Sequence, residues 1–263
     1  MLDSDDQSKW DTFANEILEQ INVLIYPKSL KRSSDNQLIF NTASDSAYID
    51  KAQYFIDMPV MGHLIGVLWV LTVGQYLDDR SISEDPKMYL HSYGNRLRKV
   101  SKSEYKSVIT RSPHLFESYF SQYQSWRDRA LECAKKCLDN KKDVMIITLD
   151  FKSFFYSVDI DKESFIKIYS DAIVEGKQNT NLTLPFWTER VHQFVYNVFS
   201  EYSKKLGDIN RTKELELQNR VFLPIGFLPS NIMSNWILTP FDNAINDKIN
   251  PIYYGRHVDD III

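Results

Sequence analysis

The residues of this chain best suited to chemistry are acids that interrupt apolar runs. Asp150 closes the run VMIITLD, and Asp259 and Asp260 stand side by side within PIYYGRHVDDIII. Burying a carboxylate without a partner is unfavourable, so acids at such places need compensating positive charge. Two divalent cations about 3.5–4 Å apart would provide it, and they could also stabilise the attacking and leaving oxygens of a phosphoryl transfer.

The same acids have a purely structural interpretation. Asp is common in turns, so Asp150 could simply cap the segment that follows it. Asp259 and Asp260 could likewise do no more than form the turn of a hairpin. The residue types and their spacing leave both interpretations open.

Short strands would have to position these acids. Val144–Asp150 is β-branched and apolar, which predicts a buried strand with a carboxylate at its end. Two apolar runs around the acid pair predict a β-hairpin over Pro251–Ile263, with the acids at its turn. Adjacent strands would supply the rigid, converging oxygen ligands that a hard cation such as Mg²⁺ requires.

Three segments resemble the motifs of reverse transcriptases, in the order that this family requires. LDFKSFFYSVD (149–159) resembles motif A, LPIGFLPSNIMSNW (223–236) resembles motif B, and YYGRHVDDIII (253–263) resembles motif C. HSYGNRL (91–97) is similar to part of the fingers. FFYSV, SNIMSNW and YGRxVDD are most similar to the bacterial antiphage reverse transcriptases, the abortive-infection and defence-associated group. The resemblance covers residues 54–263.

The resemblance implies an α+β, helix-rich fold of the right-hand polymerase type, with fingers, a palm and a small antiparallel palm sheet. Asp150, Asp259 and Asp260 would be its catalytic acids and metal ligands, and the backbone carbonyl of Phe151 would be a further ligand. Two Mg²⁺ ions, which Mn²⁺ could replace, would assist attack of a 3′-hydroxyl on the α-phosphate of a dNTP. An RNA or DNA strand is the implied partner, and some members of the group make DNA without a conventional template or from a protein primer.

Five residues, Phe151 among them, are candidates for contact with the substrate. Phe155 matches the family's steric gate against the ribose 2′-hydroxyl, and strand alternation would place it on one face with Phe151. Arg96 and Lys152 are candidates to neutralise the triphosphate, and Gly226 would let the backbone approach the nascent base pair. The alternatives are structural: Phe155 could be an aromatic residue of the core, and Arg96 and Lys152 could be charges that face solvent.

Composition excludes several classes of protein. Of the 263 residues, 43% are apolar and 13% aromatic, which predicts a folded chain with a sizeable core. A net charge of −4 is unlike that of a non-specific nucleic-acid coat. Two cysteines cannot form a disulfide framework, and the acids among the first six residues are unlike a signal peptide. We therefore expect a cytoplasmic protein.

The chain divides into three expected regions: an N-terminal helical extension (1–50), a fingers-like helical region (51–143) and a palm (144–263) with a helical segment at about 162–220. The polar stretch Lys31–Ser46 predicts a loop, and Pro240 should kink or break the last helix. Apolar spacing predicts helices over Asp6–Ile25, Gln53–Tyr76, Leu115–Cys137, Leu184–Lys205 and Ser230–Ile249.

One apolar stretch raises the question of a membrane. Met58–Leu77 has no formally charged residue over about twenty positions, the length of a bilayer span. Acids rather than Lys or Arg flank it, so we expect a buried helix and no membrane contact.

The sequence departs from the family at four places, one of which is Pro240 in the helix after motif B. His257 stands where the family usually has Tyr, and Ile225 where many members have Gln. Ile263 comes three residues after the second motif C acid, so we expect the thumb of the family to be missing. We therefore expect a fragment, a truncated product or one piece of a split enzyme, completed by a partner protein or by the missing C-terminal part. The competing hypothesis is a non-catalytic structural module that folds against a partner.

Overall fold

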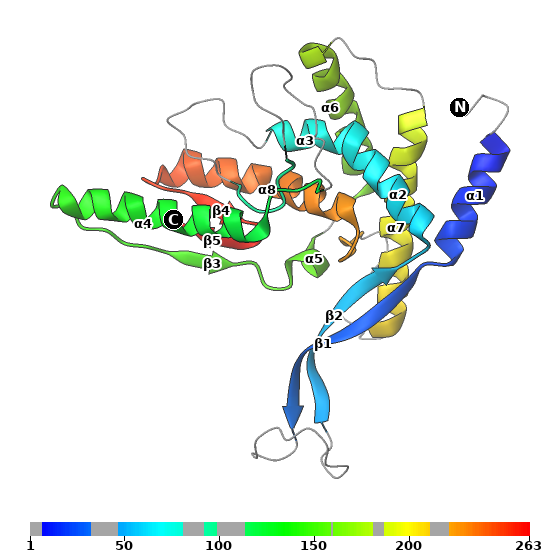
Figure 1. Ribbon diagram of the computed structural model, residues 1–263, viewed down its shortest axis with the longest axis horizontal. Coiled ribbons are helices and arrows are strands. Elements are labelled where there is room, and N and C mark those ends of the chain that lie inside the picture. Colours follow the sequence, from blue (N-terminus) through cyan, green and yellow to red (C-terminus); the bar gives the residue numbers. More distant parts are fainter. Residues whose placement is uncertain are drawn as a thin grey trace.

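The computed structural model has an α+β fold and describes residues 7–32, 47–80, 92–98, 114–158, 160–180, 187–210 and 221–263 (Figure 1). Its helical elements are α1 (Gln7–Glu19), α2 (Val60–Trp69), the π-helical η2 (Val70–Gly74), α3 (Gln75–Arg80), α4 (Tyr119–Asp139), α5 (Phe154–Ser157), α6 (Lys162–Thr180), α7 (Trp187–Asn210) and α8 (Leu228–Ile249). Its strands are β1 (Asn22–Arg32), β2 (Ala47–Asp57), β3 (Thr148–Asp150), β4 (Gly255–His257) and β5 (Asp260–Ile262). The α+β class expected from the sequence is confirmed.

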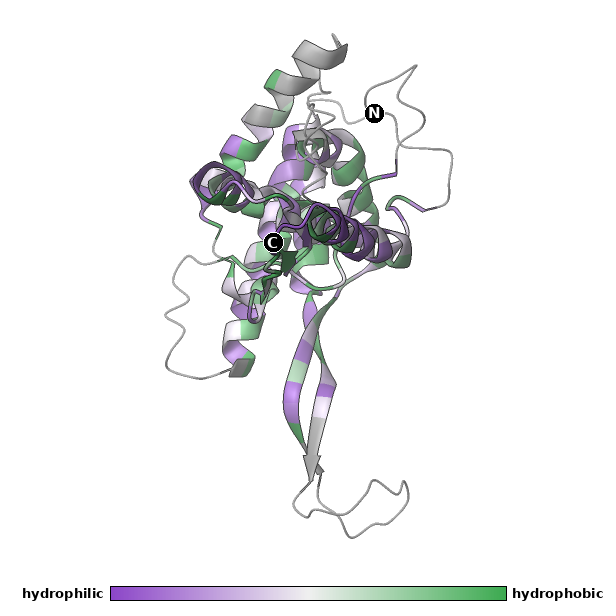
Figure 2. Cartoon of the chain, turned by 90° about the vertical axis from the view of Figure 1, so that its left-hand side faces the viewer, coloured by the Kyte–Doolittle hydropathy of each residue, from purple (hydrophilic) through white to green (hydrophobic). Residues whose placement is uncertain are grey.

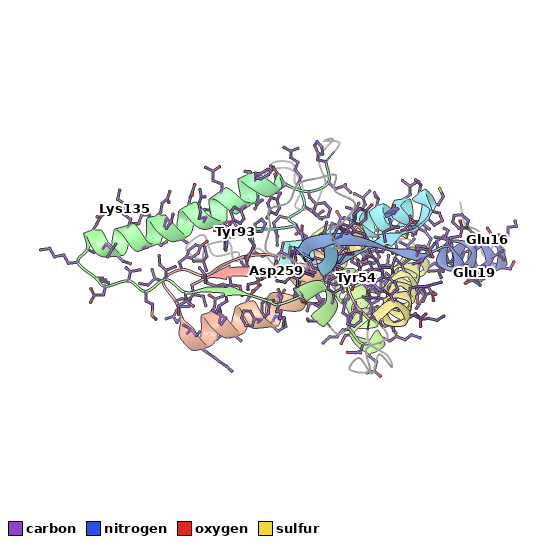
Figure 3. All side chains as sticks on the ribbon, turned by 90° about the horizontal axis from the view of Figure 1, so that it is seen from below. Glu16, Glu19, Tyr54, Tyr93, Lys135 and Asp259 are labelled. Carbon is purple, nitrogen blue, oxygen red and sulfur yellow. The ribbon has the colours of Figure 1, made fainter. Side chains whose placement is uncertain are left out.

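A small antiparallel sheet carries the acids. Its strand order is β3-β5-β4, and the predicted C-terminal hairpin is confirmed as β4 and β5 with a turn at Val258 and Asp259. Figure 3 shows α4 on one side of this sheet and α8 on the other. The strand predicted over Val144–Asp150 is found only at its end, and its residues are exposed rather than buried. The reason is that β3 is an edge strand in this part of the fold and pairs only with β5.

A long hairpin of β1 and β2 extends away from the body of the molecule (Figures 1 and 2). Its register begins with Asn22 opposite Asp57, so the helix predicted to run to Ile25 ends earlier, at Glu19. The helix predicted over Gln53–Tyr76 begins later, at Val60, because Gln53 falls within β2, as does the region boundary expected at residue 50. Most of the predicted loop, residues 33–46, lies outside the described residues.

The main core forms around the α2–η2–α3 run. Trp69, Val70 and Val73 are fully buried there, and α2 packs against α7 and α8. Within the described ranges, Val60–Asp78 is the one helix long and apolar enough to cross a membrane, and half of it is buried inside the fold. One face of it packs against the core, whereas Val60, Met61, Leu64 and Leu68 are exposed.

The helix α8 is continuous from Leu228 to Ile249, although Pro240 lies within it. The predicted break is therefore not found. Asn235 and Asp242, seven residues apart, both lie on its buried face, because seven residues are close to two helical turns. The helices predicted over Leu115–Cys137 and Leu184–Lys205 are confirmed as α4 and α7, with shifted ends.

Candidate active site

The small sheet brings the three predicted acids together. Asp150, the last residue of β3, lies directly opposite Asp260, the first residue of β5. The amide of Phe151 donates a hydrogen bond of 3.2 Å to the carbonyl of Asp259, which places the turn beside the end of β3. Residues 110 positions apart in sequence therefore lie beside each other at one end of one sheet.

Electrostatics at this edge favour a cation. Partial burial raises the pKa of Asp259, and the neighbouring charges of Asp260 and Asp150 raise it further, whereas Lys28 opposes the rise. Burial also raises the pKa of Asp260, with Asp150 as the next cause. Like charges held together make ionisation less favourable, and a bound cation would remove that penalty.

The three carboxylates fit Mg²⁺ by their chemistry, although their side chains do not converge on one point in this structure. In the part of the chain that the structure describes, no three His, Cys, Asp or Glu side chains form a ready group of metal ligands. A directly opposed pair such as Asp150 and Asp260 nevertheless has its Cβ atoms about 4.5–5.5 Å apart. Hard carboxylate oxygens at that separation could share a cation after rotation of the side chains alone.

A cleft of about 650 Å³ opens beside the acids. Two of the three acids line it, and so do the candidate substrate residues Lys152, Phe155 and Gly226. Its size falls within the range of ligand sites in proteins. Four of the site residues predicted besides the acids, Phe151, Lys152, Phe155 and Gly226, are thus placed at one cavity.

The base of the β1–β2 hairpin forms another wall of this cleft, at Tyr54 (Figure 3). The amide of Tyr54 donates to the hydroxyl of Tyr156 at 2.9 Å, and the hydroxyl of Tyr202 donates to the carbonyl of Tyr54 at 2.9 Å. The amide of Ile56 donates to the carbonyl of Ile225 at 2.9 Å. Hydrogen bonds made by the hairpin backbone thus join it to Tyr156 and Ile225, in the segments that resemble motifs A and B.

Two cleft cations were missed by the sequence analysis. Lys28 and Lys51 come from the two strands of the hairpin and line the cleft together with Lys152. All three are exposed, so they can meet an anionic ligand. One sequence feature could have predicted the hairpin that carries Lys28 and Lys51. Residues 22–26 and 48–56 are rich in β-branched and aromatic side chains, which favours paired strands.

Arg96 takes a structural role instead of the predicted substrate contact. Its side chain is only 5% exposed, its Nε lies 3.2 Å from Asp78 Oδ1, and it also donates to the carbonyl of Asp78. Burial lowers the pKa of Arg96, and the adjacent carboxylate of Asp78 opposes that effect. Arg96 lines no part of the cleft as the described residues define it. A buried, paired guanidinium cannot also neutralise a triphosphate there.

Phe155 lines the cleft, but the local structure that places it there differs from the predicted strand. Strand alternation does not apply, because Phe154–Ser157 form the short helix α5. Phe154 turns into the core at 5% exposure, whereas Phe155 is half-buried at the cleft. The amide of Leu223 donates to the Phe155 carbonyl at 3.1 Å and so joins this turn to the segment before Gly226.

Gly226 is required by its backbone conformation rather than by crowding within the protein. Its φ is +93°, a backbone conformation that residues with a side chain rarely adopt. A Cβ there would meet its nearest neighbour, a carbon of Phe55, at an ordinary 3.7 Å. The space beside Gly226 is therefore cleft, open to a ligand.

His257 is buried behind the turn at 2% exposure. Its ring packs edge-on against Tyr119 at 4.8 Å and lies near Tyr123 and Trp126 of α4. This side chain therefore supports the sheet from the side of α4 and lines no described part of the cleft.

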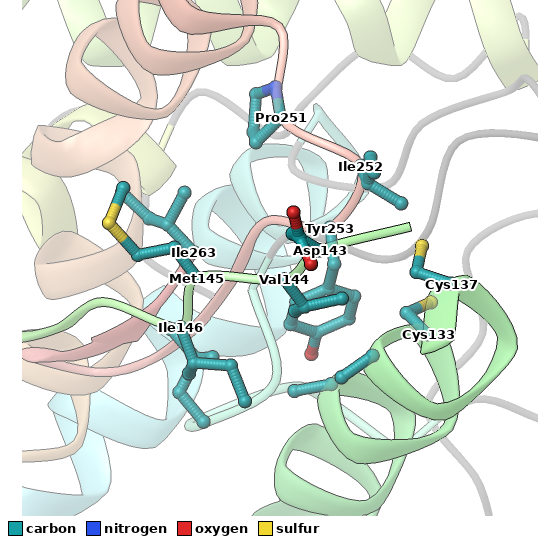
Figure 4. Close-up of a pocket in the computed structure, with 13 residues that line it drawn as sticks. Cys133, Cys137, Asp143, Val144, Met145, Ile146, Pro251, Ile252, Tyr253 and Ile263 are labelled. Atoms are coloured by element: carbon teal, nitrogen blue, oxygen red, sulfur yellow. The ribbon is translucent and has the colours of Figure 1, made fainter. Parts of the chain in front are cut away.

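A second cavity, of about 200 Å³, lies between α4 and the C-terminal end of the sheet (Figure 4). Cys133 and Cys137 line it together with apolar side chains such as Val144 and Ile252. Both cysteines are free thiols. They belong to no group of three metal-ligating side chains within the described ranges.

Comparisons of the chain with models of protein families, with curated proteins and with solved structures found no match. The likeness to reverse transcriptases therefore rests on the three motifs, and the functional argument rests on the geometry of the site.

Proposed function

We propose that this chain is a reverse-transcriptase-like nucleotidyltransferase that makes DNA from dNTPs. The observation that carries the proposal is the meeting of Asp150, Asp259 and Asp260 at one sheet edge, beside a cleft that also holds Lys28 and Lys51. Acids for a divalent metal next to cations for phosphate are the two requirements of a nucleotidyl-transfer site.

Each cleft residue then has a role in the reaction. The three acids, with the Phe151 carbonyl, would hold two Mg²⁺ ions, and such ions would supply stabilisation of the charge that develops on the attacking and leaving oxygens. The exposed lysines bind the triphosphate, which must be oriented for attack by a 3′-hydroxyl on its α-phosphate. Phe155 closes the space that a ribose 2′-hydroxyl would need, and Gly226 leaves room for the base pair.

The residues of the three motifs also suggest a biological role, which we include in the proposal. Their similarity to the abortive-infection and defence-associated enzymes supports a role in bacterial antiphage defence, in the cytoplasm, on an RNA or DNA strand. Synthesis without a template or from a protein primer belongs to the same proposal.

The test is incorporation of labelled dNTPs by the purified full chain with Mg²⁺ or Mn²⁺, with and without a primer–template. Asp259→Asn should lower incorporation at least about 100-fold, or ~3 kcal/mol in the barrier, since a metal-site contribution is several kcal/mol. Asp161→Asn is the matched control, because Asp161 caps α6 through the amide of Ser164 at 2.7 Å and Asn also caps well. Equal incorporation by wild type and Asp259→Asn would overturn the proposal, as would a wild type inactive in every condition.

One observation favours a second function, a non-catalytic structural module. The acids are not gathered into a ready ligand group among the described residues. A metal-competent site should raise the melting temperature in Mn²⁺ or Mg²⁺, because a ligand of the native state stabilises it by mass action. A shift seen in wild type and lost in Asp259→Asn supports the enzyme, whereas an equal response of both proteins supports the module.

A further inference from the structure

The turn that carries Asp259 has an unusual backbone. Val258 has a φ of +60°, in the left-handed region, where a β-branched residue is rare. A two-residue hairpin turn with positive φ at its first position ordinarily has Gly there. Something else in the fold must therefore hold Val258 in this conformation, and the residue it aims is Asp259.

The guanidinium of Arg256 contacts this turn directly. Arg256 is fully buried on β4, and its Nη1 donates to the carbonyl of Val258 at 2.9 Å. The same Nη1 donates to Asn235 Oδ1 at 3.0 Å. The hydrogen bond to Val258 joins residues only two positions apart, across the start of the turn.

The charge of Arg256 is balanced by a bidentate ion pair with α8. Nε donates to Asp242 Oδ1 at 2.9 Å and Nη2 donates to Oδ2 at 2.8 Å. The hydroxyl of Tyr254 also donates to Oδ1 of Asp242. A planar guanidinium that donates to a carboxylate through two of its nitrogens, Nε and Nη2, has little freedom to rotate. Its third nitrogen, Nη1, is therefore fixed in place relative to α8.

The other side of the turn rests on the segment around Gly94. A Cβ at Gly94 would lie 2.6 Å from Cγ2 of Val258 and 3.0 Å from its amide nitrogen, so no larger residue fits. Asn235 Nδ2 donates to the carbonyl of Gly94 at 2.9 Å, which holds this segment on the same helix as the ion pair. The turn is thus enclosed between Arg256 and Gly94, and both are attached to α8.

We propose that Arg256 is a positioning residue: held by Asp242, its guanidinium fixes the Val258 carbonyl and so keeps the turn in the conformation that presents Asp259 to the metal ions. The part that concerns metal rests on the proposed function. The part that concerns the turn stands by itself.

The test compares wild type, Arg256→Lys, and Arg256→Lys combined with Val258→Gly. Lysine keeps the positive charge beside Asp242 but lacks the fork that also reaches Val258. Glycine adopts positive φ without help, so it should make the clamp unnecessary. Trp69→Phe is the matched control, because it removes another buried hydrogen bond, the one that Trp69 donates to His192.

Two readouts are taken on the folded proteins: Mn²⁺ affinity by titration, and deuterium uptake of the peptide that spans residues 255–263. Arg256→Lys should weaken Mn²⁺ binding about 10–100-fold, the usual effect of losing an outer contact to a metal ligand, and should speed exchange at the turn. Val258→Gly should restore most of the affinity, and Trp69→Phe should change neither readout.

The outcomes separate the two proposals. Wild-type affinity and exchange in Arg256→Lys, or no recovery on adding Val258→Gly, would overturn the positioning role. If wild type itself binds no Mn²⁺ and incorporates no nucleotide, the proposed function fails. The exchange data then still decide whether Arg256 holds the turn.

Discussion

One buried histidine, His192, should contribute strongly to the pH dependence of stability. It lies on α7 at 5% exposure, stacked on Phe165 with ring centroids 4.2 Å apart. Trp69 Nε1 donates to its Nδ1 at 2.9 Å, and its Nε2 lies 2.8 Å from the carbonyl of Phe165. One ring nitrogen accepts and the other donates, which is the pattern of a neutral imidazole.

The size of the effect comes from the shift in pKa. Burial lowers the pKa of His192 from 6.5 to about 4, so its contribution is fully present above pH 6.5 and is lost as the pH falls toward 4. The difference of about 2.5 units corresponds to about 3 kcal/mol in total, of which about 2 kcal/mol is already lost at pH 5. For a chain of this size, that lowers the melting temperature by about 4–8 °C.

The assay is the free energy of unfolding by denaturant from pH 7.5 to pH 4.5, for wild type and for His192→Gln. Glutamine does not titrate, so the difference between the two proteins isolates His192 from the carboxylates that also change charge. Wild type should be the more stable at pH 7.5, and its advantage should shrink by about 2 kcal/mol at pH 5. A difference that stays constant with pH would show that His192 does not stay neutral in the folded state, and the reasoning would be refuted.

Two further predictions concern the cleft. Phe155→Ala should raise the ratio of ribonucleotide to deoxyribonucleotide incorporation at least about tenfold, since the ring would no longer exclude a 2′-hydroxyl. An unchanged ratio would leave Phe155 with a packing role only. Replacing Lys28 and Lys51 together by Gln should raise the KM for dNTP about tenfold, more at low salt, with little change in kcat. Lys135→Gln, at an exposed position of α4, should leave the KM as it is (Figure 3).

The elements around the three acids could be predicted because their signals are local. An acid at the end of an apolar run and an acid pair between two runs are each visible within about a dozen residues. The helices α4 and α7 likewise follow from apolar spacing along one segment. What the sequence did not contain is the register, which sets Asp150 opposite Asp260.

The β1–β2 hairpin shows why the rest was missed. Trp10, Phe13, Ile17 and Ile21 recur at three- and four-residue steps, and Leu24 continues the pattern by coincidence, since it lies exposed in a strand. A strand is stabilised by its partner, and the partner of β1 lies beyond residue 46, out of reach of any local pattern. Lys28 and Lys51 were missed for the same reason.

Arg96 shows the reverse error, in which a local pattern suggested function. A basic cluster after a glycine resembles a phosphate-binding segment, but burial depends on what packs over it. Here the carboxylate of Asp78 takes the guanidinium, so a charge that looks solvent-facing in sequence becomes part of the core. The structural role of Arg256 could not be predicted for the same reason, because its ion-pair partner, Asp242, lies on another element, α8.

The cleft therefore has two kinds of support, which differ in the contacts that hold them. The acids sit on a sheet whose turn is tied to α8 by the buried fork of Arg256. The lysines sit on a hairpin that is joined to the body near its base, through Tyr54 and Ile56, and that extends freely beyond (Figure 2). Metal geometry tolerates little displacement, whereas a lysine is a flexible point charge that can follow a moving phosphate. The part of the fold tied to α8 thus carries the ligands that need precision, and the extended part carries the charges that do not.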